Sequence, residues 1–146
     1  MEYVQMARFQ LVEYEQASPE VRAIYDDVMA TLGTTKLPIW IRALGASVSL
    51  LRGNWEKTKA VLASGQIPRL LKELIIFYVS TKRGSEYCSA CHAHAALQQD
   101  PSLTYRDLKA LVSGQEYASM PESFKIAIRV AAKSALDSSS VTDEDF

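Results

Sequence analysis

The sequence is poor in cysteine and has no excess of basic residues. Its 146 residues include two cysteines, and 16 lysine and arginine residues stand against 17 aspartate and glutamate residues, for a net charge of -1. Two cysteines are too few for the disulfide framework of a small secreted domain. A chain without a basic stripe is also a poor candidate for binding nucleic acid. We therefore expect neither a disulfide-stapled fold nor a nucleic-acid partner.

Long hydrophobic runs are missing as well. The longest run, residues 70–79, contains Lys72 and Glu73 and is too short to span a bilayer. Residues 1–16 carry three glutamates and lack the basic segment and the apolar core of a signal peptide. We expect a cytoplasmic protein without a membrane partner, in which thiols stay reduced unless they take part in chemistry.

Apolar residues recur at helical spacing along almost the whole chain, and no alternating strand pattern competes with them. Ser18, Pro19 and Glu20 form a helix start signal, and Gly33 forms a stop signal. Similar signals predict helices over residues 19–32, 38–44, 47–63, 68–82, 85–99, 104–111 and 121–136. We therefore predict an all-α helical bundle that forms a single domain over residues 1–146, with a disordered tail at 137–146.

Two consecutive predicted helices carry the candidate chemistry. Glu73 lies in the most apolar helix, which should be central, and a carboxylate there needs a partner. Cys88 lies in the first turn of the next helix, with Ser85 at the N-cap, where unpaired N–H groups and the helix dipole favour a thiolate. His92 is four residues further along the same face and can accept the thiol proton. Because the connection is short, we predict that Glu73 reaches His92 and orients it.

The segment from Glu73 to His92 resembles the core of the carboxymuconolactone decarboxylase and alkylhydroperoxidase-D superfamily. In its peroxidase branch, a glutamate is followed twelve positions later by a Cys-x-x-Cys-x-x-x-His motif. Glu73, Cys88 and His92 match this pattern, whereas Ser85 stands in place of the first cysteine. The resemblance is strongest over residues 68–97 and implies an alkylhydroperoxidase-D-like helical bundle whose core spans about residues 37–100.

The resemblance implies a thiol-dependent peroxidase in which Cys88 reduces a hydroperoxide while His92 and Glu73 relay the proton. In that branch the first cysteine resolves its oxidised partner or gives it a proton. Ser85 can relay a proton but cannot form a disulfide, so an external thiol could restore Cys88. The resemblance also implies a homo-oligomer, and we expect no cofactor.

The role of Cys91 is open, because no family role corresponds to it. It follows Cys88 by three residues, which places the two Cβ atoms roughly 5–6 Å apart on a regular helix. A disulfide prefers about 3.8 Å, so bridging would require the first turn to distort. Cys91 is therefore either a structural residue or a substitute for the cysteine missing at Ser85.

Other readings compete with the peroxidase. The chain could be a non-redox enzyme of the decarboxylase branch, or an inactive binding or scaffold protein, and Glu73 could pair with Lys72 or Arg69 through solvent. The segment from Cys88 to His92 also has the Cys-x-x-Cys-His pattern of covalent haem attachment, with Met120 as a second ligand. We rank haem low because no export signal is visible. A zinc site at Cys88, Cys91 and His94 lacks a fourth ligand.

Overall fold

The computed structural model describes residues 10–115 and 120–146, which contain helices and no β-strand. The all-α prediction is therefore confirmed for this part of the chain. Residues 1–9 lie outside the described part of the chain. They belong to the segment that was predicted to lack a signal peptide. The chain divides into two compact units, Met1–Gly65 and Gln66–Phe146, each with its own core. The single-domain organisation stays a prediction.

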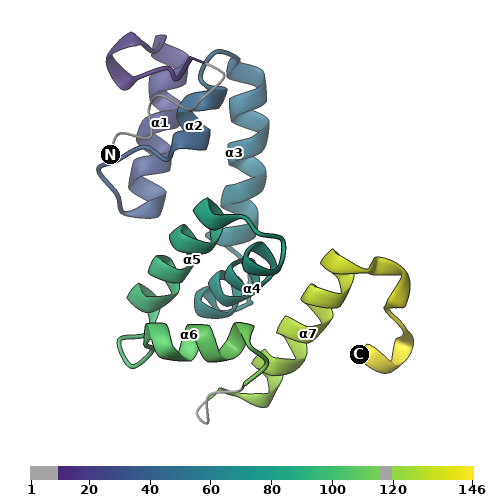
Figure 1. The fold of residues 1–146 in the computed structure, drawn as a ribbon. Helices are drawn as coiled ribbons and strands as arrows, with labels where there is room; N and C mark the ends of the chain where they lie inside the picture. Colours follow the sequence, from purple (N-terminus) through teal and green to yellow (C-terminus); the bar gives the residue numbers. More distant parts are fainter. Residues whose placement is uncertain (1–9, 116–119) are drawn as a thin grey trace. The chain divides into compact units, whose positions relative to one another are not determined.

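Residues 10–65 of the first unit form a short 3-10 helix and three α-helices: η2 (Tyr14–Gln16), α1 (Pro19–Leu32), α2 (Ile39–Leu44) and α3 (Val48–Leu62) (Figure 1). Helix α1 begins as predicted, because the Ser18 hydroxyl accepts a hydrogen bond from the Val21 N–H at 3.3 Å. It also ends as predicted at Gly33, whose φ of 63° suits a residue without Cβ. The core of this unit consists of Ala17, Val21, Ile24, Tyr25, Val28, Ile41, Leu51 and Trp55.

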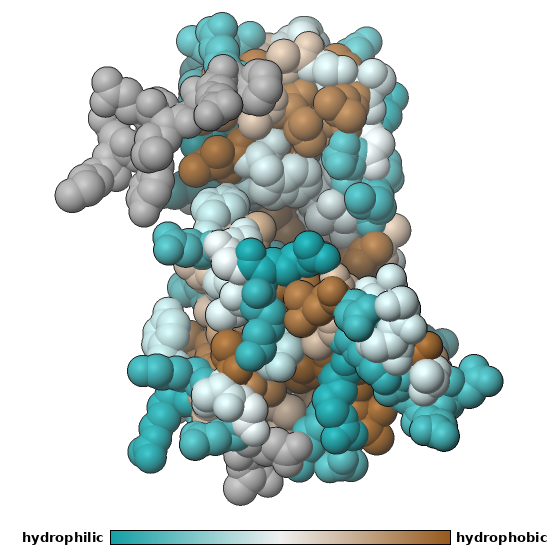
Figure 2. All heavy atoms as spheres, turned by 45° about the vertical axis from the view of Figure 1, so that its right-hand side comes forward, coloured by the Kyte–Doolittle hydropathy of each residue, from teal (hydrophilic) through white to brown (hydrophobic). Residues whose placement is uncertain are grey.

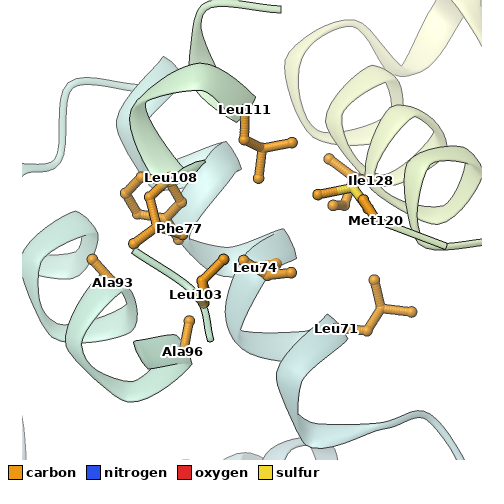
Figure 3. Packing of buried hydrophobic residues seen from close by; sticks show 10 residues of the cluster. All are labelled: Leu71, Leu74, Phe77, Ala93, Ala96, Leu103, Leu108, Leu111, Met120 and Ile128. Carbon is orange, nitrogen blue, oxygen red and sulfur yellow. The ribbon is translucent and has the colours of Figure 1, made fainter. Parts of the chain in front are cut away.

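The described residues of the second unit, 66–115 and 120–146, form four α-helices: α4 (Arg69–Lys82), α5 (Glu86–Gln99), α6 (Tyr105–Val112) and α7 (Glu122–Leu136). Helix α4 packs against α5, α6 and α7. The prediction that this apolar helix is a central one is therefore confirmed within the second unit. Figure 3 shows the buried cluster that these helices share. Its members are Leu71, Leu74, Phe77, Ala93, Ala96, Leu103, Leu108, Leu111, Met120 and Ile128.

The tail after α7 forms two single 3-10 turns, η3 (Ser138–Ser140) and η4 (Asp143–Asp145). Lys133 on α7 makes an ion pair with Asp145 at 2.6 Å, which ties the second turn to the helix. The two turns are short enough to form from local hydrogen bonds alone. The predicted disorder of this tail stays a prediction.

The surface mixes polar and apolar side chains. On the face drawn in Figure 2, apolar residues lie in separate areas between hydrophilic ones. None of the helices in the described part of the chain has both the length and the apolar character needed to span a bilayer.

Candidate active site

The centre of the candidate site is a hydrogen bond between neighbouring helices. His92 Nδ1 on α5 lies 2.6 Å from Glu73 Oε2 on α4. The Glu73 side chain is 1% exposed and the His92 side chain 22%. Helices α4 and α5 pack closely because only three residues connect them. The predicted contact between Glu73 and His92 is therefore present.

Glu73 also pairs with Arg69, one turn earlier on α4. The Arg69 Nε–H donates to Glu73 Oε1, so each carboxylate oxygen has its own partner. The prediction treated Arg69 and His92 as alternatives, whereas Glu73 binds both at once. A spacing of four residues on a helix brings two side chains together, and this was the signal for Arg69.

These two partners keep Glu73 ionised despite its burial. Burial raises the pKa of the carboxyl group, but the hydrogen bonds from His92 and Arg69 and the attraction of their charges outweigh it. The net effect is a pKa below the ordinary glutamate value. Glu73 is thus a carboxylate at neutral pH.

The ionisation of Glu73 fixes the tautomer of neutral His92. A carboxylate can only accept hydrogen bonds, so the proton of the short contact belongs to His92 Nδ1. Neutral imidazole carries one N–H, which leaves Nε2 without a proton. His92 Nε2 is therefore the nitrogen that can act as a base.

Cys88 lies one helical turn before His92 on α5, in the first turn of that helix. It is partly buried and its thiol is free. The spacing places Cys88 and His92 on one face of α5, as predicted. Among the hydrogen bonds of the described residues, none joins the Cys88 thiol to His92, whose Nδ1 contacts Glu73. The structure thus joins the His92 imidazole to the Glu73 carboxylate. It places the Cys88 thiol on the same face of α5 as His92, without a hydrogen bond between the thiol and the imidazole.

Ser85 occupies the predicted N-cap position, but its side chain makes no capping hydrogen bond. The Ser85 N–H donates to the Ser80 carbonyl at 2.9 Å and so closes the C-terminal end of α4. The Ser85 backbone therefore takes part in the end of α4 as well as in the start of α5. The proton-relay role of Ser85 stays a prediction.

A pair of hydroxyls that was not predicted links the same two helices. Thr81 Oγ1 on α4 lies 3.0 Å from Ser89 Oγ on α5, and Ser89 Oγ donates to the Ser85 carbonyl at 2.8 Å. The contact lies next to Cys88 and helps to hold α5 in register with α4. Hydroxyl residues near helix ends are too common to have indicated it from sequence.

The remaining candidates lie away from this network. Cys91 is exposed, and exposed His94 pairs with Gln98 at 3.1 Å. Met120, the suggested second haem ligand, packs with Ile128 in the buried cluster of the second unit (Figure 3). The described residues include no group of three or more His, Cys, Asp or Glu side chains that could hold a metal ion.

Comparison with known proteins relates this geometry to solved structures. No family model and no curated protein matches the sequence. The alkylhydroperoxidase AhpD core from Rhodospirillum rubrum is 27% identical, with a TM-score of 0.64, over 95% of this chain and 96% of that one. The chain therefore has the helical fold of the alkylhydroperoxidase-D-like superfamily.

Two further solved structures share the alkylhydroperoxidase-D-like fold. A peroxidase-related protein from a Silicibacter species is 22% identical, with a TM-score of 0.69, over 96% of this chain and 75% of that one. A cysteine-to-alanine variant of a debrominase in complex with 2,3,4-tribromopyrrole is 20% identical, with a TM-score of 0.77, over 97% of this chain and 73% of that one. The fold therefore occurs in proteins of more than one activity.

Proposed function

We propose that this protein is a thiol-dependent peroxidase in which Cys88 reduces a hydroperoxide. The observation that carries the proposal is the 2.6 Å contact between His92 Nδ1 and Glu73 Oε2. In neutral His92 this contact places the proton on Nδ1, so that Nε2 can accept a proton, on the same helix face as Cys88 and one turn away from it. A thiol beside an oriented imidazole is the arrangement that activates a cysteine nucleophile.

The reaction begins with transfer of the Cys88 thiol proton to His92 Nε2. The gap between them is bridged by a water molecule or closed by rotation of the Cys88 side chain. Glu73 stabilises the resulting imidazolium through Nδ1, and Arg69 keeps Glu73 ionised. The position of Cys88 in the first turn of α5 further favours the thiolate.

The thiolate then attacks one oxygen of the hydroperoxide. A sulfur–oxygen bond forms, the O–O bond breaks, and Cys88 is oxidised to a sulfenic acid. The leaving alkoxide takes the proton from His92, directly or through Ser85, and departs as an alcohol. Two external thiol groups, for example those of a dithiol, supply the two electrons that return the enzyme to its reduced state and become a disulfide.

The proposal is tested by measuring consumption of hydrogen peroxide and of tert-butyl hydroperoxide with a small dithiol as reductant. We expect Cys88→Ser to reduce the rate at least about 100-fold, because a hydroxyl is a far weaker nucleophile. His92→Gln should reduce it by a similar factor. The matched control is His94→Gln, which changes an exposed histidine on the same helix and should leave the rate within about twofold.

Equal rates for the wild type and Cys88→Ser would overturn the proposal. Turnover of a lactone or a related small acid in both proteins would then favour the decarboxylase branch. A Cys88 thiol inert towards alkylation near neutral pH would favour an inactive binding protein. Assembly into a homo-oligomer and a cytoplasmic location are further proposals, which size-exclusion chromatography and cell fractionation can test.

A further inference from the structure

We propose that Cys91 is the resolving thiol of this protein and forms a disulfide with oxidised Cys88. The inference rests on the proposed function, because it concerns the step that follows formation of the Cys88 sulfenic acid. It assigns to Cys91, on the C-terminal side of Cys88, the role that the serine at position 85 cannot perform.

Helix geometry brings the two sulfurs into the same neighbourhood. Cys91 follows Cys88 by three residues within α5, so the two side chains lie on adjacent turns of one face. Their Cβ atoms must approach from roughly 5–6 Å to about 3.8 Å for a disulfide to form. This approach requires a local change in the backbone between residues 88 and 91, close to the start of α5.

The start of α5 has no side-chain cap, as is also true of α2, α4 and α7. The side chains of Ser18, Ser47 and Thr104 cap α1, α3 and α6, whereas the Ser85 side chain makes no capping hydrogen bond. A helix end without a side-chain cap has fewer interactions to lose when it distorts. The lack of a hydroxyl cap thus lowers the resistance of this turn to disulfide formation.

The difference in exposure between the two cysteines suits their proposed roles. Cys88 is partly buried beside His92, whereas Cys91 is exposed. An exposed side chain can move towards Cys88 without leaving a cavity in the core. It also keeps the finished disulfide accessible to an external dithiol, which must attack a sulfur atom in line.

The proposed step balances without any further oxidant. The Cys91 thiolate attacks the sulfur of the Cys88 sulfenic acid, and a sulfur–sulfur bond forms as the sulfur–oxygen bond breaks. The hydroxide that leaves takes the proton released by Cys91 and departs as water. An external dithiol then reduces the disulfide and becomes oxidised, so that two electrons pass from the dithiol to the hydroperoxide in each cycle.

The test is treatment of the full chain with one equivalent of hydrogen peroxide, with dimedone present to trap sulfenic acid. In the wild type we expect a disulfide, seen as a loss of two hydrogen atoms in the intact mass. We expect about tenfold more dimedone adduct at Cys88 in Cys91→Ser than in the wild type, because nothing resolves the sulfenic acid there. Amide exchange at residues 86–91 should also increase when the wild type is oxidised, because the first turn distorts.

The outcomes separate this inference from the proposed function. Equal labelling of Cys88 in the wild type and Cys91→Ser, with no disulfide, would overturn the role of Cys91 and leave an external thiol as the resolving group. Absence of sulfenic acid and of disulfide in both proteins would overturn the peroxidase proposal and this inference with it. His94→Gln is the control on the same helix and should behave as the wild type does.

Discussion

Each unit of this protein contains a carboxylate that binds a ring N–H from a neighbouring helix and a nearby cation. In the first unit, Asp27 on α1 accepts from Trp55 Nε1 at 2.6 Å and from Lys59 Nζ at 2.8 Å, both on α3. In the second unit, Glu73 on α4 contacts His92 Nδ1 at 2.6 Å and also pairs with Arg69. In both units these contacts lower the pKa of the carboxyl group.

The two arrangements differ in the ring and in the burial of the carboxylate. An indole N–H can only donate, whereas an imidazole also has a second nitrogen that can take up a proton. The Asp27 side chain is 40% exposed and the Glu73 side chain 1%. The same pattern of contacts therefore joins two helices in both units, and in the second unit it also orients an imidazole that has a second ring nitrogen.

The largest expected effect is a difference in hydroperoxide consumption between a variant of His92 and a variant of Trp55. His92→Gln should reduce hydroperoxide consumption at least about 100-fold, because the glutamine amide cannot accept the thiol proton. Trp55→Phe removes the matching N–H donor of the first unit and should leave the rate per folded molecule within about twofold. Steady-state assays at equal concentrations of folded protein make this comparison. Equal losses in both variants would mean that the rings have no distinct roles.

A second comparison concerns the stability that each carboxylate supplies. Glu73→Gln should reduce the free energy of unfolding by roughly 3 kcal/mol, because it removes a buried carboxylate and its charge-assisted hydrogen bonds to half-buried Arg69 and His92. Asp27→Asn should reduce it by about 1 kcal/mol, because its pair with Lys59 is partly exposed. Urea unfolding followed by circular dichroism measures both values. A larger loss in Asp27→Asn would contradict the difference in burial.

The pH dependence of stability provides a third comparison. A lowered pKa in the folded state means that the unfolded chain binds more protons as the pH falls, so stability decreases in acid. For Glu73 the decrease begins near the ordinary glutamate pKa of about 4.3 and is complete below the folded-state value. Urea unfolding between pH 7 and pH 3 should show a shallower decrease in Glu73→Gln than in the wild type. An unchanged slope would show that Glu73 is not held ionised by its partners.

The smallest expected effect comes from salt. Added sodium chloride screens exposed charges and affects buried pairs much less. The stability difference between the wild type and Asp27→Asn should shrink by a few tenths of a kcal/mol in about 1 M salt. The difference caused by Glu73→Gln should stay the same. If the stability difference caused by Glu73→Gln also shrank in salt, this would indicate that water reaches the Glu73 carboxylate.

Helix boundaries could be predicted closely because their signals are local. The helix predicted over residues 19–32 is α1 with the same bounds, and the other predicted helices differ from the observed ones by one residue at one or both ends. Start and stop residues such as Ser18 and Gly33 act within one turn of the chain, so a single sequence contains the necessary information.

The contact between Glu73 and His92 was also predictable, because a short connection forces α4 and α5 to pack together. The uncapped start of α5 was not. The Ser85 backbone also closes the end of α4 through the Ser80 carbonyl, and this contact depends on how the two helix ends meet. The position of the thiol relative to the imidazole was beyond prediction for a similar reason, because rotation about one side-chain bond decides it.

The most direct test of the account is the rate at which iodoacetamide alkylates Cys88 at pH 7. The measurement uses the Cys91→Ser variant, so that Cys88 is the thiol that is alkylated. It is made with and without the additional His92→Gln change. We predict that loss of the imidazole slows alkylation about tenfold or more, and that His94→Gln has no effect. Equal rates with and without His92 would contradict the claim that this histidine activates Cys88.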